Sequence, residues 1–199
     1  YSLVDFGNAV SMVTADPSDA ANNVAQTTKA AGAETWAGTT VDGGPAVYPL
    51  TAAASTMTVR VWSPAAGITV RLKTENAADG TLSVETDAVT TMAGAWETLT
   101  FDFANQADGT AALNESVTYD KLSIFFNFGV AGDDSVYYWD DVTFGGSAGG
   151  AEAMPPSPIT FDDAAVNYVL TDFGNAGSML VADPADATNM VAQTTKAAG

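Results

Sequence analysis

Two neighbouring stretches, Met57-Thr-Val-Arg-Val-Trp62 and Ile68-Thr-Val-Arg-Leu-Lys73, decide the fold class. In both, apolar and polar residues alternate strictly, so each places its apolar side chains on one face of an extended chain. The segment between them, Ser63-Pro-Ala-Ala-Gly67, is short and has the composition of a turn. The pattern therefore predicts two β-strands that pair in an antiparallel hairpin.

Three more stretches further along the chain carry the same period of two: Trp96–Phe103, Lys121–Phe128 and Val136–Phe144. In the second of them, the even-numbered residues from Leu122 to Phe128 are expected to face inward. Helical periodicity is weak throughout. Many short strands with one apolar face each predict an all-β protein, built as an antiparallel β-sandwich.

The beginning of the sequence is repeated near its end. Residues 1–32 and 168–199 align without a gap at a constant offset of 167, with 24 of 32 positions identical. The period has the size of a whole domain, which indicates a tandem array of domains. The array makes neighbouring copies of the same repeat expected partners.

The segment between the two copies sets the expected domain boundaries. Residues 145–158 read GGSAGGAEAMPPSP, a composition typical of a linker. Residues 159–167 (ITFDDAAVN) then read as the first strand of a new module. We therefore expect a sandwich module over 1–144 that lacks its own first strand, and the start of the next repeat over 159–199. The leader 159–167 is expected either to supply a missing strand or to reflect an arbitrary boundary.

Composition excludes several classes of function. The chain has 24 Asp and Glu, 6 Lys and Arg, and neither His nor Cys, for a net charge of −18. It therefore has no Ser-His-Asp triad, cysteine nucleophile, thiolate or imidazole zinc site, or disulfide. The acidic balance argues against nucleic acid as a partner. No apolar run approaches the roughly 20 residues that span a bilayer, so membrane insertion is not expected.

An aromatic platform is the first candidate site. Trp62 and Trp96 fall on the polar faces of their strands, and Trp36 lies in the polar segment Glu34–Thr39. Indole rings stack on the apolar faces of sugars, and guanidinium or amide groups bind the hydroxyls. The predicted hairpin would place two arginines beside Trp62, and the full candidate set is Trp36, Arg60, Trp62, Arg71, Trp96 and Asn127. The alternative is that Trp62 covers the sheet while the arginines pair with carboxylates.

Paired aspartates form a second candidate site. Asp140-Asp141 closes the last strand of the module, and Asp162-Asp163 lies in the leader of the next repeat. Carboxylate oxygens of this kind suit Ca²⁺, which would tie first strand to last. Asp16, Asp19 and Asn22 lie together in a loop that contains proline. Solvated turn carboxylates are the alternative in each case. No acidic pair lies in a recognisable acid/base motif, so catalysis is not expected.

Several segments resemble one family of modules: 168–175 (YVLTDFGN), 33–39 (AETWAGT), 59–64 (VRVWSP), 96–103 (WETLTFDF), 124–128 (IFFNF) and 137–142 (YYWDDV). The chain is similar to jelly-roll carbohydrate-binding modules that occur in tandem on secreted polysaccharide-degrading enzymes of marine bacteria, notably laminarinase-like β-glucanases. The resemblance implies a secreted, non-catalytic, calcium-stabilised module that binds β-glucan or a related polysaccharide. Its ligand residues would be Trp36, Arg60 and Trp62, and its calcium ligands Asp140 and an acid equivalent to Asp162.

Two functions therefore stand beside each other. The first is glycan binding by a module of a secreted multimodular protein, with avidity raised by the array. The second is a structural repeat of an extracellular fibre or adhesin, in which residues 159–199 complete or link neighbouring modules. The near-identical copies and the Gly/Pro linker favour the second reading, and the tryptophans and arginines favour the first.

Overall fold

The computed structural model describes residues 2–42, 48–146, 176–182, 184 and 190–196. It forms two compact units, Tyr1–Ala151 and Glu152–Gly199, which are described separately. Every regular element among the described residues is a β-strand. This part of the chain contains no helix that is long and apolar enough to cross a bilayer. The strands of the first unit are β1 (Ser2–Phe6), β2 (Ala9–Asp16), β3 (Asp19–Lys29), β4 (Gly38–Asp42), β5 (Thr56–Ser63), β6 (Thr69–Asn76), β7 (Asp79–Val89), β8 (Ala95–Asp102), β9 (Lys121–Phe126) and β10 (Ser135–Gly146).

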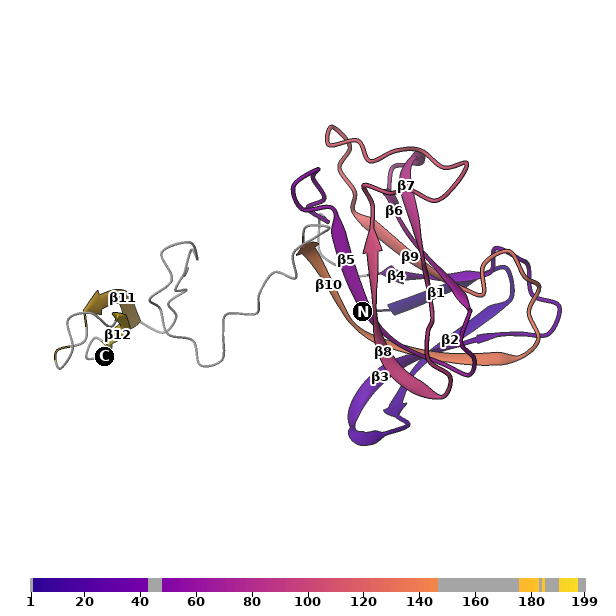
Figure 1. The fold of residues 1–199 in the computed structure, drawn as a ribbon, viewed down its shortest axis with the longest axis horizontal. Coiled ribbons are helices and arrows are strands. Elements are labelled where there is room, and N and C mark those ends of the chain that lie inside the picture. Colours follow the sequence, from indigo (N-terminus) through magenta and orange to yellow (C-terminus); the bar gives the residue numbers. More distant parts are fainter. Residues whose placement is uncertain (1, 43–47, 147–175, 183, 185–189, 197–199) are drawn as a thin grey trace. The chain divides into compact units, whose positions relative to one another are not determined.

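These strands form two antiparallel sheets of five (Figure 1). The first sheet has the order β1-β4-β9-β6-β7, and the second has the order β2-β3-β10-β5-β8. Side chains of both sheets meet in one core, where Met57, Val59 and Val61 of β5 are fully buried with Ile124 and Phe126 of β9. The predicted antiparallel β-sandwich is confirmed, and the alternation of the chain between the sheets follows a jelly-roll pattern.

The predicted hairpin of the first two stretches is wrong. β5 and β6 lie in opposite sheets: β5 pairs with β10 and β8, whereas β6 pairs with β7 and β9. The short connection crosses from one sheet to the other, where the backbone N–H of Gly67 donates to the carbonyl of Thr90. Alternation requires only that each strand bury its own apolar face. A crossover between the sheets buries the apolar faces of the two strands as well as a hairpin within one sheet would. Arg60 and Arg71 consequently point outward from opposite sides of the sandwich.

The inward direction predicted for Phe128 is also wrong. β9 ends at Phe126, and Asn127 has a left-handed backbone with a φ of 48°. This conformation breaks the alternation of the strand, and Phe128 packs on the outer face of the first sheet instead. The other predicted inward residues of β9, Leu122, Ile124 and Phe126, are buried as expected.

The second unit contributes one hairpin to the described residues, β11 (Ala176–Ala182) with β12 (Met190–Lys196). Its register runs from Ala176 opposite Lys196 to Ala182 opposite Met190. The equivalent positions of β2 and β3 pair in the same way, from Ala9 opposite Lys29 onward. The Ser178–Thr194 hydroxyl contact likewise repeats the Ser11–Thr27 contact. The linker beyond Gly146 and the leader 159–167 lie outside the described residues.

Candidate functional site

A groove lies on the outer face of the first sheet, over β4, β9, β6 and β7, and has a volume of about 370 Å³. We call it the aromatic groove. One part of it is aromatic and the other is charged, which gives the groove both apolar surface and hydrogen-bonding groups. Its lining residues are Phe6, Trp36, Thr40, Lys73, Glu75, Glu85, Lys121, Ser123, Phe125 and Phe128.

The aromatic part is a chain of ring contacts. Trp36 stacks on Phe6 at 6.2 Å, and Phe6 meets Phe125 edge to face at 5.4 Å. Phe125 in turn contacts Phe128 at 5.7 Å. Gly38 permits this packing, because a Cβ there would lie 2.8 Å from a ring carbon of Phe125 and 2.9 Å from one of Phe6. Trp36, which is 49% exposed, presents its indole to solvent at the end of the chain of rings.

The charged part is a continuous line of ion pairs across the strands. Glu75 binds Lys121 and Lys73, each at 2.6 Å, and Lys73 reaches Glu85 at 4.0 Å. Glu85 then accepts from Arg71 at 3.1 Å. At the end of this line, Arg71 holds Asp87 with two hydrogen bonds of 2.7 and 2.8 Å and covers the ring of Phe128 at 3.8 Å. Three cations and three anions alternate, so the line carries no net charge.

Contacts within this line favour the ionised forms of Glu75 and Arg71. Burial alone would raise the pKa of Glu75, but hydrogen bonds from Lys121 and Lys73 lower the pKa below its ordinary value. Hydrogen bonding to Asp87 raises the pKa of Arg71, against the effect of burial. Glu75 therefore stays ionised near neutral pH, which leaves it without a proton to give as a general acid.

A buried lysine from the second sheet holds one end of the aromatic groove. Lys29 on β3 is 2% exposed, and its ammonium donates to the carbonyls of Thr35, Phe126 and Asn127 at 3.2, 3.1 and 2.9 Å. Burial lowers the pKa of Lys29, and the charge of Asp133 partly offsets this effect. Since Thr35 precedes Trp36 and Asn127 precedes Phe128, this single ammonium fixes the backbone beside two of the groove's rings.

A separate cluster occupies the outer face of the second sheet. Arg60 donates to Asp16 through both terminal nitrogens at 3.2 Å and lies 4.0 Å over the ring of Trp96. Trp96 donates its indole N–H to the other oxygen of Asp16 at 3.0 Å. Trp62 is half-buried and meets Tyr138 edge to face at 5.4 Å. Burial would raise the pKa of Asp16, yet hydrogen bonds led by those from Ser18 hold it well below its usual range.

The structure therefore divides the six predicted glycan-binding residues between two faces. Trp36 lines the aromatic groove, and Arg71 and Asn127 do not line it but adjoin the lining residue Phe128. Arg60, Trp62 and Trp96 lie on the opposite sheet. The prediction missed Phe6 and Phe125. The run Ile124-Phe-Phe126 contained the signal for Phe125, because the middle residue of three apolar residues in a strand faces away from the other two.

The predicted calcium ligands stay a prediction. Asp140 accepts a hydrogen bond from Asn22 at 3.0 Å, and the adjacent Asp141 is exposed with a φ of 50°. Asp162 and Asp163 lie outside the described residues. Among the residues that are described, no three acidic side chains gather in a group that could hold a metal. The two aspartates of β10 would need further oxygen ligands to form a calcium site.

Comparisons with known proteins gave structural likenesses alone. No protein-family model and no curated protein matches the sequence. The CBM22-1–GH10 modules of Clostridium thermocellum xylanase 10B, complexed with xylohexaose, are similar with a TM-score of 0.47 at 11% identity, over 73% of this chain and 26% of that one. The family 11 carbohydrate-binding module from Clostridium thermocellum, in complex with a β-1,3-1,4-mixed-linked tetrasaccharide, has a TM-score of 0.49 at 11% identity, over 73% of this chain and 88% of that one. The CBM22-2 xylan-binding domain of Paenibacillus barcinonensis Xyn10C has a TM-score of 0.44 at 20% identity, over 73% of this chain and 91% of that one.

Proposed function

We propose that residues 2–146 bind a neutral polysaccharide of the β-glucan type in the aromatic groove, without catalysing its cleavage. The observation that carries this proposal is an exposed indole that lies on the same face as a line of ion pairs whose charges cancel. Trp36 and Phe6 offer stacked aromatic surface to the apolar face of a sugar ring. Within the line, the ammonium groups of Lys121 and Lys73 carry three donors each, more than their carboxylate partners take up, so they can also donate to hydroxyl groups.

The charge balance of the groove indicates what kind of glycan it takes. A polyanionic sugar would meet Glu75, Glu85 and Asp87, and a cationic one would meet Arg71 and the two lysines. Because the two signs balance along the line, neither kind of ionic sugar gains a net attraction there, and the overall charge of −18 repels a polyanion. Hydroxyl groups both donate and accept, so a neutral sugar fits a line in which the two signs alternate.

The cluster on the second sheet supports a structural role better than a binding role. The terminal nitrogens of Arg60 and the indole N–H of Trp96 are directed at Asp16, so these donors are already engaged. Trp62, half-buried against Tyr138, then covers the sheet. This is the alternative that the sequence left open for Trp62, and it makes Trp62 a suitable control for Trp36.

Titration calorimetry or affinity electrophoresis with laminarin, mixed-linkage β-glucan and xylan tests the proposal. Removing an indole that anchors a ligand typically costs more than about 1.4 kcal/mol, or a factor of ten in affinity. Trp36→Ala should therefore lose at least about ten-fold in affinity, while Trp62→Ala retains the wild-type value. If Trp62→Ala loses binding and Trp36→Ala does not, the assignment to the aromatic groove is wrong.

The setting of the module is part of the proposal. Its resemblance to modules of secreted polysaccharidases supports an extracellular bacterial protein with several modules, and the acidic composition suits a salt-tolerant surface. Calcium is proposed as a structural ion near Asp140 and Asp141, where it would add coordination bonds to the last strand. Detection of the protein in culture medium or on the cell surface tests its location.

A structural repeat of an extracellular fibre or adhesin is the second candidate. The observation that favours it is the identical register of β11–β12 and β2–β3 at equivalent positions of the two copies. Two copies that form the same hairpin suit an array of equivalent modules. Small-angle scattering of a chain with several repeats would distinguish an extended, regularly spaced array from collapsed or irregular modules.

A further inference from the structure

Two hydroxyl groups lie at the floor of the aromatic groove. Thr40 on β4 and Ser123 on β9 are directly opposite each other in the register of the first sheet, and both line the groove. Thr40 is 9% exposed and Ser123 is 5% exposed, so little of either side chain reaches the surface. Their side-chain oxygen atoms are 2.7 Å apart and share a hydrogen bond. We call these two residues the hydroxyl pair.

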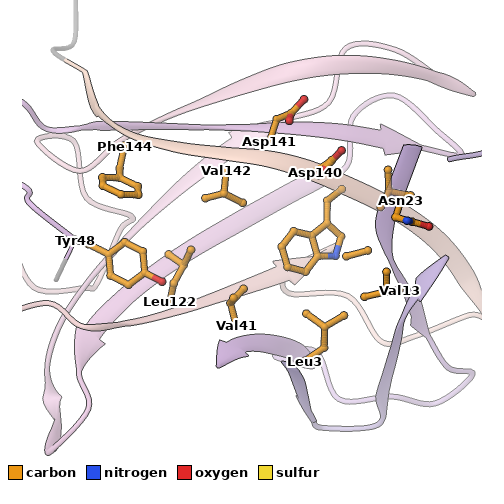
Figure 2. Close-up of a pocket in the computed structure, with 13 residues that line it drawn as sticks. Leu3, Val13, Asn23, Val41, Tyr48, Leu122, Asp140, Asp141, Val142 and Phe144 are labelled. Carbon is orange, nitrogen blue, oxygen red and sulfur yellow. The ribbon is translucent and has the colours of Figure 1, made fainter. Parts of the chain in front are cut away.

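The alternation of the strands explains why the hydroxyl pair faces the groove. Val41 of β4 and Leu122 of β9 line the space between the two sheets, where Figure 2 shows both side chains. Successive side chains of a strand point to opposite faces of the sheet. Thr40 and Ser123, which are their neighbours in the sequence, therefore project from the outer face of the first sheet, where the aromatic groove lies.

Larger side chains surround the hydroxyl pair and make it the base of a depression. Lys121, Ser123 and Phe125 occupy every second position of β9 and project from the same face. Ser123 is the shortest of the three, so Phe125 forms an apolar wall on one side of it and Lys121 a charged wall on the other. Lys73 of β6 is the register partner of Ser123 and borders the floor from the next strand.

The hydroxyl pair keeps unused hydrogen-bonding capacity. Each hydroxyl has one hydrogen and two acceptor sites, and the bond between them uses one hydrogen and one acceptor site. Among the residues that the structure describes, neither side chain has a second hydrogen-bond partner. The ammonium of Lys73 has three hydrogens, of which the contact with Glu75 at 2.6 Å takes up one. A hydroxyl hydrogen, several lone pairs and a lysine donor therefore remain for a ligand.

We propose that the hydroxyl pair binds the hydroxymethyl group of a hexose, so that the aromatic groove selects glucan over xylan. This inference rests on the proposed binding of a neutral polysaccharide, and it specifies the group of the sugar that the groove recognises. A sugar ring that lies flat against the wall of Phe125 turns one edge toward the floor. Its secondary hydroxyls are attached directly to ring carbons, whereas the hydroxymethyl oxygen lies one carbon further out. This oxygen therefore reaches deepest, while its methylene contacts Phe125.

Xylan lacks the group that this floor recognises. Xylose has the pyranose ring of glucose without the hydroxymethyl group. A bound xylan chain would displace water from the hydroxyl pair and give no hydroxyl in return, and a buried polar group without a partner is unfavourable. Sites that hydrogen-bond a hydroxyl of the ligand discriminate against analogues that lack it. We therefore expect at least about ten-fold weaker binding of the xylose-based chain.

The second sheet contains a matched pair of hydroxyls for comparison. Thr58 on β5 and Thr143 on β10 are also opposite each other, and their hydroxyls share a hydrogen bond. Neither residue lines the aromatic groove. Replacement of both by valine therefore controls for the loss of a hydrogen bond between strands, which is the whole effect expected if the hydroxyl pair of the groove serves only to join β4 and β9.

Titration calorimetry with cellohexaose and xylohexaose tests the inference, because these chains share their length and β-1,4 linkage and differ in the hydroxymethyl groups. The wild type should bind cellohexaose at least about ten-fold more tightly. In Thr40→Val with Ser123→Ala, the two affinities should converge to within about two-fold, mainly through weaker binding of cellohexaose. Ser123→Ala alone, which removes one oxygen atom, should change the ratio in the same direction.

The control, Thr58→Val with Thr143→Val, should keep the ratio of the wild type. Circular dichroism and thermal unfolding verify that each variant is folded. A wild type that binds xylohexaose as tightly as cellohexaose, or that binds neither, overturns the inference. A ratio that stays unchanged in the folded variants of the hydroxyl pair overturns it as well.

Trp36→Ala separates this inference from the proposed function. Both sugars have an apolar ring face on which the indole can stack, so this variant should weaken the binding of both by a similar factor. Loss of binding in Trp36→Ala with an unchanged ratio in the variants of the hydroxyl pair overturns the inference and leaves the proposed function standing. A wild type that binds none of laminarin, mixed-linkage β-glucan and xylan overturns the proposed function and this inference with it.

Discussion

Replacement of the buried lysine beside the aromatic groove gives a stringent test of how the groove is held. Lys29→Met keeps the length of the side chain and removes the ammonium that binds three backbone carbonyls. A buried carbonyl that loses its partner costs about 1–3 kcal/mol. Part of this cost is offset, because methionine avoids the desolvation that lowers the pKa of Lys29. We therefore expect a loss of about 3 kcal/mol in the free energy of unfolding.

Chemical denaturation followed by tryptophan fluorescence measures this loss. At roughly 2–4 °C per kcal/mol, the thermal midpoint should fall by about 6–12 °C. Lys121→Met is the control, because its ammonium is partly exposed and, among the described residues, forms an ion pair with Glu75, a contact worth about 1 kcal/mol or less. Glycan affinity of Lys29→Met should also weaken, since the backbone beside Trp36 and Phe128 is released. A stability within about 1 kcal/mol of the wild type would refute the reasoning, since ~3 kcal/mol is expected.

Three further predictions concern other parts of the sandwich. The pKa of Asp16 is depressed in the folded chain, so its contribution to stability is present above the ordinary value of 3.8 and is lost as the pH falls toward the folded value. Asp16→Asn should therefore unfold more easily than the wild type near pH 7, with a gap that narrows below pH 3.8; a constant gap contradicts this. Gly38→Ala should cost about 1–3 kcal/mol and weaken glycan binding, because its Cβ would meet the carbonyl of Ile124 and the ring of Phe125 at 2.8 Å; unchanged melting and affinity would contradict the packing. Chelation with EDTA should lower the thermal midpoint of the wild type more than that of Asp140→Asn, and equal shifts in both would count against the calcium prediction.

The individual strands could be predicted from the sequence, but their partners could not. Strict alternation predicts a strand over Met57–Trp62 and leaves little choice of element, and the structure extends this strand by one residue at each end. The same alternation is satisfied by a hairpin and by a crossover, so it did not reveal that β5 and β6 lie in opposite sheets. That choice depends on which sheet edge each strand reaches, which is a property of the whole chain.

Individual residues of the candidate site could likewise be predicted from the sequence, but not which of them lie together. The sequence points to Trp36 because an indole in a polar segment is out of place, and to Arg71 because it lies on the polar face of a strand. Their joint location with Phe6 and Phe125 depends on strand order, which the local pattern does not contain. The left-handed turn at Asn127, which moves Phe128 to the outer face, likewise depends on a conformation that Asn tolerates without requiring it.

The cancelling charges of the aromatic groove would affect how closely protein molecules can bind along one polysaccharide. Because the six ionised groups of the line cancel, the net charge of −18 comes from the rest of the chain. Molecules bound side by side on one polysaccharide strand would repel each other over about a Debye length, ~10 Å at 0.1 M salt. Ionic strength would then control the spacing between occupied sites and the saturation density, while the affinity of a single site for sugar would stay nearly the same.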